Sequence, residues 1–244
     1  MSKPRDKSAS QGARKARKGD GWKSNLVTIG GALLLALFIR VTLFEAFAID
    51  GPSMEPTLLD GDRVVVAKYP YGLFLPFTNE AAWNWGGPDP GDVIILHSPA
   101  DNEDIVKRVI GVGGDEILIQ DGKISRNGKV LETIELGPCS AEQQRSIDPT
   151  CRVYQETLNG KPHQISHSKH DFPLDRPLLT VPPGHVYVLG DHRDSSNDSR
   201  NPLIGAVPNS RIKGRARFIY MSWKNSRSSF WERIRWSRVG HSLD

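Results

Sequence analysis

The sequence predicts a mostly β domain of several antiparallel strands, preceded by one N-terminal transmembrane helix. Two observations predict the β domain: β-branched runs that follow Gly-Asp turns, and a meander interrupted by Asp121-Gly122 and Asn127-Gly128, both type I′ turn signals. A third observation predicts the helix, because residues 26–39 form an uninterrupted apolar run. At 244 residues, the chain has the length of one β domain with extensions.

Charge divides the chain into three parts. Residues 1–24 carry eight basic and two acidic residues, a net charge of +6, which predicts a disordered basic tail. Residues 211–244 carry nine basic and two acidic residues, a net charge of +7, while residues 25–210 carry 15 basic and 24 acidic residues, a net charge of −9. Nucleic-acid binding needs a basic face on the folded domain, so no nucleic-acid partner is expected. Basic ends instead favour anionic membrane headgroups.

The apolar run predicts a membrane anchor over residues 25–48. As a helix, residues 26–39 would measure about 21 Å, and continuation to Phe47 passes the roughly 30 Å of a bilayer core. The positive-inside rule places the basic tail in the cytoplasm and the remaining domain outside it. A cleaved signal peptide is the alternative, because Ala46-Phe47-Ala48 has the small-x-small form of a cleavage site. The long basic tail favours an uncleaved anchor.

Beyond Asp50 the sequence is mostly typical of strands. Residues 70–90 and 136–183 are rich in Pro, Gly and polar residues and are predicted to be loops or insertions. Short strands at this spacing indicate a sandwich or barrel-like β fold. The predicted strands, in chain order, fall within residues 61–69, 91–97, 104–112, 116–120, 123–126, 129–131, 185–190 and 215–220.

Three short stretches hold candidate chemistry. Gly51–Leu58 places Ser53 between prolines, in a segment that by itself would be a turn linking anchor to domain. Within Asp104–Asp115, Lys107 interrupts a run of apolar strand residues, and the following glycines indicate a tight connection between strands, since they lack the spacing of a phosphate-binding loop. Gly190–Arg200 is strongly polar but does not supply the alternating oxygen ligands of a calcium loop.

Together these stretches resemble the type I signal peptidases, the membrane-anchored serine proteases of bacteria that remove signal peptides. The family pattern is Ser-Met-x-Pro after an anchor, then Lys-Arg-x-x-Gly-x-x-Gly-Asp, then Gly-Asp-(Asn/His)-Arg-Asp. This chain has Ser53–Pro56, Lys107–Asp115 and Gly190–Asp194 in that order, and residues 205–216 are similar to the family's last strand region. Several motifs in register are more specific than any one. The resemblance implies a signal-peptidase-type β protease domain over residues 49–222.

The resemblance also implies roles for individual residues. Ser53 would be the nucleophile, Lys107 the general base, and Ser196 the residue that orients the lysine amine. The backbone N–H of Ser53 would stabilise the oxyanion; some relatives add a serine hydroxyl two positions earlier, where this chain has Gly51, so the second donor stays open. The polar scaffold behind the site would consist of Asp191, Arg193, Asp194, Asp198 and Arg200.

Residue chemistry is consistent with a Ser–Lys pair. A serine hydroxyl needs a base beside it, and lysine can act as that base only when neutral. Lowering a lysine pKa from about 10.4 to about 8 requires roughly 3 kcal/mol of differential desolvation, which the apolar neighbours of Lys107 can supply. No cofactor and no metal are expected. His163, His167 and His170 could share one helical face, but a solvated loop is the favoured interpretation.

The predicted function is therefore a membrane-anchored serine endopeptidase that cleaves signal peptides from exported preproteins after small-x-small sites. It would cross the bacterial inner membrane once, with a cytoplasmic N-terminus and a periplasmic catalytic domain. Expected partners are signal-peptide-bearing preproteins, membrane lipids and, by proximity, the export translocon. Two alternatives remain: a self-cleaving repressor-type Ser-Lys protease, disfavoured by the predicted anchor and by the lack of a DNA-binding motif, and a non-enzymatic membrane-anchored binding domain.

Two further features concern stability and membrane contact. Cys139 and Cys151 flank a polar loop in the part expected outside the cytoplasm, where disulfides persist, and a bridge would contribute about 3 kcal/mol. Residues 223–244 combine Trp with Lys and Arg and predict a loosely amphipathic helix from about Ser228 that rests on the bilayer. A terminal helix packed on the domain is the alternative.

Overall fold

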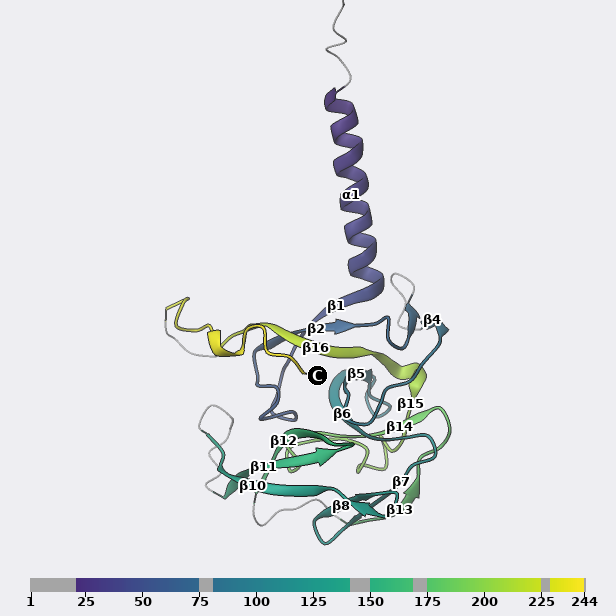
Figure 1. Cartoon of the computed structure of the whole chain (residues 1–244), viewed down its shortest axis with the longest axis vertical. Coiled ribbons are helices and arrows are strands. Elements are labelled where there is room, and N and C mark those ends of the chain that lie inside the picture. The colour runs from purple at the N-terminus through teal and green to yellow at the C-terminus, as the bar shows by residue number, and fades with distance from the viewer. Residues whose placement is uncertain (1–20, 75–80, 141–149, 169–174, 225–228, 244) are drawn as a thin grey trace, which may run out of the picture. The chain divides into compact units, whose positions relative to one another are not determined.

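The computed structural model is built mainly from antiparallel strands, as predicted (Figure 1). Its contacts divide the chain into two units, residues 1–38 and 39–244. The residues that the structure describes are 21–74, 81–140, 150–168, 175–224 and 229–243.

Helix α1 covers Gly21–Leu43 and includes the predicted apolar run. It ends before Phe47, where the sequence analysis extended it, because Phe44–Ala48 form strand β1 and pair with β2 (Asp62–Ala67). The predicted continuation of the helix to Phe47 was therefore wrong. In β1 the backbone N–H and C=O groups are satisfied by pairing with β2 instead of by helical hydrogen bonds, and this tertiary contact outweighs local helix propensity. Among the described residues, none of the helices combines the length and the hydropathy that a membrane crossing requires.

The largest sheet has seven strands in the order β1-β2-β16-β5-β6-β14-β15, with every neighbouring pair antiparallel. Side chains of β5 alternate between two cores: Val93 and Ile95 pack in one, Ile94 and Leu96 in the other. Burial on both faces explains why this strand is a continuous apolar run. The remaining strands of this sheet are β6 (Asp104–Val112), β14 (His185–Leu189), β15 (Val207–Pro208) and β16 (Ile212–Ser222); β5 is Val93–His97.

A four-stranded sheet has the order β13-β7-β8-β9 and contains the predicted meander. Both predicted turns are confirmed: Asp121 and Gly122 have φ of 48° and 72°, and Asn127 and Gly128 have φ of 54° and 74°. Positive φ at both central residues is what a type I′ turn requires. The strands are β7 (Glu116–Gln120), β8 (Lys123–Arg126), β9 (Lys129–Val130) and β13 (Arg176–Thr180).

The expectation of loops over residues 70–90 and 136–183 was wrong. The first range contains a hairpin, and the second contributes most of a three-stranded sheet in the order β10-β11-β12. Asn159 and Gly160, with φ of 52° and 74°, make a third type I′ turn between β11 and β12. Polar composition hid these strands, although buried and less buried positions still alternate along much of β11. Their bounds are β3 Gly72–Phe74, β4 Ala81–Asn84, β10 Glu132–Pro138, β11 Cys151–Leu158 and β12 Lys161–Ser168.

The predicted disulfide is present. It joins Cys139, just after β10, to Cys151, the first residue of β11, with a Cα–Cα distance of 5.5 Å. The bridge therefore closes the connection between two neighbouring strands of the three-stranded sheet.

The C-terminal segment does not form the predicted α-helix in its described part, residues 229–243. It is built from turns and a 3-10 helix at Trp236–Arg238; a second 3-10 helix lies at Asn209–Arg211. The Arg238 guanidinium pairs with Asp62, and the Arg235 guanidinium donates to the Asp60 carbonyl at 3.0 Å. This segment therefore contacts the domain through its arginine side chains, without the helix that both interpretations assumed, and Trp231 and Trp236 stay exposed.

Candidate active site

Ser53 lies on a tight turn that is fastened to the core by its neighbours. The Glu55 N–H donates to the Pro52 carbonyl at 3.0 Å, and the Leu58 N–H donates to the Met54 carbonyl at 2.9 Å. The Met54 and Leu58 side chains are fully buried beside β2 and β16 residues. Ser53 itself is only partly buried. The turn therefore holds its apolar residues in the core and leaves the hydroxyl accessible.

Lys107 lies at the middle of β6, and the fold brings its amine to Ser53. Its Nζ donates to Ser53 Oγ at 2.9 Å and to the Val106 carbonyl at 3.0 Å. Strands β5 and β14 flank β6 on its two sides, so the lysine backbone is held within the sheet. The two residues predicted as nucleophile and base, 54 positions apart in the sequence, are thus in direct contact.

The surroundings of Lys107 disfavour its charged form. Only 3% of the residue is exposed, and no described carboxylate lies in ion-pair contact with the amine. Burial lowers the pKa of Lys107 to about 8, while the more distant charges of Asp198 and Asp191 partly oppose the shift. Near neutral pH a useful fraction of the amine is therefore unprotonated and can accept a proton.

The third motif, residues 190–200, contacts the turn that carries Ser53 through backbone atoms. The His192 N–H donates to the Ser53 carbonyl at 3.1 Å. Gly190 lies against the same carbonyl oxygen, and a methyl group on Gly190 would overlap both that oxygen and the Ser196 side chain. Glycine is required here because the two backbones approach so closely.

Three buried arginine–carboxylate pairs form a scaffold around this contact. Burial alone would raise the pKa of Asp191, but the charge and hydrogen bonds of Arg108 outweigh it and lower the pKa. Each pair has two short hydrogen bonds, the arrangement in which arginine binds carboxylates best. The pairs are Arg108–Asp191 at 2.8 and 2.7 Å, Arg193–Glu156 at 2.8 and 2.7 Å, and Arg200–Asp198 at 2.7 and 2.7 Å.

The remaining predicted residues are also placed by the structure. Asp194 accepts a hydrogen bond from the Ser168 N–H of β12. Ser196 is close to Gly190, but its buried hydroxyl makes no hydrogen bond with any described residue. The second bond of the lysine amine goes to Val106 instead. Orientation of the amine by Ser196 therefore stays a prediction.

Sequence reasoning missed two residues of this region, Glu156 on β11 and Ser166 on β12. Glu156 is 1% exposed and binds Arg193, while Ser166 Oγ donates to the Glu55 carbonyl at 2.9 Å. Both lie in the range expected to be loops. The Asn159-Gly160 turn signal between two alternating segments would have revealed this hairpin.

The histidines do not share a helical face. His163 and His167 lie on strand β12, and His170 falls outside the described residues. His163 Nε2 lies 3.2 Å from Glu156 Oε2, and the His167 ring stacks on Tyr154 with centroids 4.2 Å apart. Within the described chain, no three His, Cys, Asp or Glu side chains are grouped as a metal would need.

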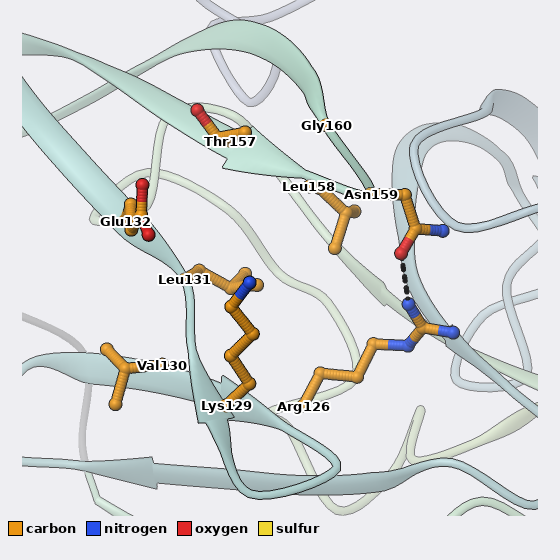
Figure 2. Close-up of a pocket in the computed structure, with 9 residues that line it drawn as sticks. All are labelled: Arg126, Lys129, Val130, Leu131, Glu132, Thr157, Leu158, Asn159 and Gly160. Carbon is orange, nitrogen blue, oxygen red and sulfur yellow. Dashed lines mark hydrogen bonds between the residues drawn. The ribbon is translucent and has the colours of Figure 1, made fainter.

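A small cavity lies away from this site. It occupies about 210 Å³ between the residues on either side of the Asn127-Gly128 turn and residues 157–160, which end in the Asn159-Gly160 turn (Figure 2). Figure 2 shows the Arg126 guanidinium donating to the Asn159 side chain, a bond of 2.6 Å. None of the predicted site residues lines it. The bond joins two hairpins, so this cavity is a feature of their packing.

Comparison with known proteins gives consistent results. A family model described as "Signal peptidase, peptidase S26" matches residues 22–223. The chain is 33% identical over 223 residues to Signal peptidase I of Pseudomonas fluorescens and 34% identical over 220 residues to that of Pseudomonas aeruginosa, in each case covering 85% of this chain and 75% of the relative. A crystal structure of a signal peptidase I from Enterococcus faecalis V583 is 27% identical, covers 53% of this chain and 97% of that chain, and has a TM-score of 0.33.

Proposed function

Because this chain belongs to the bacterial type I signal peptidases, serine hydrolases of the S26 family that cleave signal peptides, we propose that Ser53 and Lys107 form its catalytic dyad. The observation that carries the proposal is the 2.9 Å contact between Ser53 Oγ and a buried amine whose pKa lies near 8. A neutral amine at hydrogen-bond distance is what a serine nucleophile needs from its base.

The proposed reaction follows from this geometry. As Ser53 Oγ attacks the scissile carbonyl, its proton passes to the neutral Lys107 amine, and the backbone N–H of Ser53 stabilises the oxyanion. The lysine ammonium then gives that proton to the departing amine, which leaves an ester between Ser53 and the signal peptide. Lys107 next takes a proton from the attacking water, and collapse of the second intermediate returns it to Ser53.

We propose exported preproteins with small-x-small cleavage sites as substrates, which would bind extended along a strand edge. Membership of the family, rather than any pocket described above, supports this specificity. The dyad requires no metal ion, so processing should continue in the presence of a chelator. Loss of activity with EDTA and its recovery with zinc would contradict the proposed mechanism.

Membrane attachment is part of the proposal. The apolar run in residues 26–39 and the basic tail before it support a single anchor with its N-terminus in the cytoplasm and the protease domain in the periplasm, beside the export translocon. A disulfide suits that compartment. Full-length protein should stay in the membrane fraction after alkaline extraction, and its release would contradict the anchor.

Exposed aromatic side chains in the C-terminal segment support a second contact with lipid. Phe230, Trp231 and Trp236 are 57%, 68% and 57% exposed, next to basic residues. Such rings settle among headgroups while cations meet anionic lipid. The test uses anionic vesicles that carry a fluorescence quencher at headgroup level. Replacing Trp231 and Trp236 by Ser should lower the fraction of the protein's tryptophan fluorescence that the vesicles quench. If the variant and the wild type have the same quenched fraction, Trp231 and Trp236 are no closer to the headgroups than the other tryptophans, which would contradict this contact.

Replacing each dyad residue by alanine tests the central proposal. Ser53→Ala and Lys107→Ala should each lower kcat for preprotein processing by at least about 10³-fold. Exposed Ser210→Ala and Lys123→Ala are matched controls and should process normally. The wild-type rate should fall on the acid side with a midpoint near pH 8, as Lys107 becomes protonated. Substantial processing by either dyad variant would refute the dyad.

A further inference from the structure

Two contacts hold the backbone of the nucleophile turn from outside the dyad. The His192 N–H donates to the Ser53 carbonyl, and the Ser166 hydroxyl donates to the Glu55 carbonyl, at 3.1 and 2.9 Å. Both acceptors are main-chain oxygens within two residues of the nucleophile. These contacts therefore constrain the path of the chain through Ser53 and leave its hydroxyl to Lys107.

Ser166 joins three separate parts of the molecule. It is 1% exposed on β12, where its N–H donates to the Asp191 carbonyl at 2.9 Å and its own carbonyl accepts the Arg193 N–H at 2.8 Å. Its side chain then reaches the nucleophile turn. One residue thus fixes the distance between the three-stranded sheet, the third motif and the turn that carries Ser53. Thr57 Oγ1, which donates to the Gln164 carbonyl at 3.3 Å, adds a second contact with the same strand.

Two ionisable side chains lie close together beside this junction. Glu55 Oε2 is 3.9 Å from His192 Nδ1, and the two side chains are 3% and 14% exposed. The distance exceeds a hydrogen bond, but at pH values where both groups are ionised a carboxylate and an imidazolium this close attract each other in a poorly hydrated environment. Glu55 occupies the variable position of Ser-Met-x-Pro, and His192 the Asn/His position of the third motif. The pair links the same two segments that Ser166 joins.

We infer that Ser166, Glu55 and His192 are positioning residues, which hold the Ser53 turn against the third motif so that Ser53 Oγ stays within reach of Lys107. Ser166 provides the principal contact, and the Glu55–His192 pair reinforces it. None of the three touches the reacting atoms. The inference rests on the proposed Ser53–Lys107 dyad. Displacement of a nucleophile by about 1 Å can cost roughly 100-fold in rate, so a small loosening of the turn is measurable.

The principal experiment compares Ser166→Ala with Ser168→Ala in the full-length enzyme. Ser168 is a matched control, since it is a buried serine on the same strand whose hydroxyl lies 2.8 Å from Thr150 Oγ1 rather than contacting the turn. Ser166→Ala should lower kcat by about tenfold with KM nearly unchanged, because binding does not depend on the hydroxyl. Ser168→Ala should keep the wild-type kcat.

Two results would overturn the role of Ser166. One is a wild-type kcat for Ser166→Ala; the other is an equal loss in Ser168→Ala, which would indicate a general effect of β12. Each rate is divided by the fraction of folded protein, measured by thermal unfolding. If the loss in Ser166→Ala disappears after this correction, the residue affects stability only, which would also refute its positioning role. If Ser53→Ala is inactive while Ser166→Ala is normal, only this inference fails; if Ser53→Ala is active, the dyad itself fails.

A double-mutant cycle tests the Glu55–His192 contact independently of Ser166. Glu55→Gln and His192→Asn remove the carboxylate and the imidazole, while the backbone N–H of residue 192 is retained. Each variant should lower kcat about threefold, and the double variant should lose little more than either single one, since both break the same interaction. Fully additive losses, or none, would exclude the pair from positioning the turn.

Discussion

Lys107 and Arg193 are two buried cations whose surroundings are built in opposite ways. They are 3% and 1% exposed. Arg193 holds Glu156 with two hydrogen bonds, at 2.8 and 2.7 Å. Lys107 has a hydroxyl and a carbonyl as its hydrogen-bond partners, and its attraction to carboxylates acts only at longer range. The fold therefore provides a counter-ion for one buried cation and withholds it from the other.

The difference shows that burial has two outcomes: with a counter-ion the cation forms a stable ion pair, and without one its pKa falls. Burial alone would raise the pKa of Glu156, but Arg193 and the nearby His163 hold it well below its ordinary range, so this pair stays charged. Arginine does not lose its proton in a protein, so burying its guanidinium without a carboxylate partner would lower the stability of the fold. Lysine can respond to burial by releasing its proton, which is why the isolated cation is a lysine.

The largest expected effect comes from placing an arginine where the counter-ion is missing. Lys107→Arg should lower kcat by more than about 10³-fold, because a guanidinium cannot become the neutral base that Ser53 needs. Preprotein processing by the purified variant measures this, with exposed Lys123→Arg as the control. Activity within tenfold of wild type would show that the amine does not act by losing a proton.

The next effect concerns the paired cation. Arg193→Met leaves the buried Glu156 carboxylate without its guanidinium partner, and should lower the free energy of unfolding by about 4 kcal/mol. Adding Glu156→Leu should restore most of that loss, since the uncompensated charge is gone. Arg152→Met is the control, because its partner Glu135 is 52% exposed, and should cost at most about 1 kcal/mol. Denaturant unfolding gives all three values, and a double variant no more stable than the single one would contradict this account.

The smallest expected effect is a gain in stability when the unpaired cation is removed. The folded-state pKa of Lys107, about 8, lies below the unfolded value of 10.5. Below pH 8 the protonated amine must be accommodated without a counter-ion, so Lys107→Met should be more stable at pH 7 by about 3 kcal/mol. Between pH 8 and 10.5 the unfolded chain holds a proton that the folded one lacks, so the wild type gains stability as pH rises.

The difference between Lys107→Met and the wild type should therefore shrink towards pH 10.5. Unfolding in denaturant at pH 7 and pH 10 compares them, and every other titrating group is shared by the two proteins. A gap of equal size at both pH values would indicate a packing effect of methionine instead of the lysine charge.

The sequence singled out the two residues of the proposed dyad because their chemistry leaves a local pattern. Lys107 within an apolar strand and Ser53 between prolines were visible as exceptions, and the motif order fixed which serine to choose. The expected pKa near 8 agrees with the burial that the structure gives Lys107. Their contact across 54 positions could not be derived from residue spacing, because it depends on how β6 and the turn meet in the folded sheet.

The residues that support the site were harder to predict. Glu156 and Ser166 lie on strands whose polar composition resembles loops, and their role arises from partners far away in sequence. The predictions for the end of α1 and for the C-terminal segment were wrong for the same reason, because tertiary contacts decided both structures. Phe44–Ala48 is compatible with helix, but β2 pairs with it, and Arg238 is placed by Asp62 rather than by helical periodicity.

The pairing of β1 with β2 also decides the fate of the enzyme's own cleavage-like sequence. Ala46-Phe47-Ala48 pairs in register with Val65, Val64 and Arg63 of β2, and the next peptide nitrogen, that of Ile49, donates to the Asp62 carbonyl at 2.8 Å. A protease reads its substrate as an unpaired extended backbone, and this one is already engaged. In the folded molecule this segment is therefore not free to bind another copy of the enzyme as a substrate. Cleavage at this sequence by another copy would therefore have to occur before β1 pairs with β2 during folding.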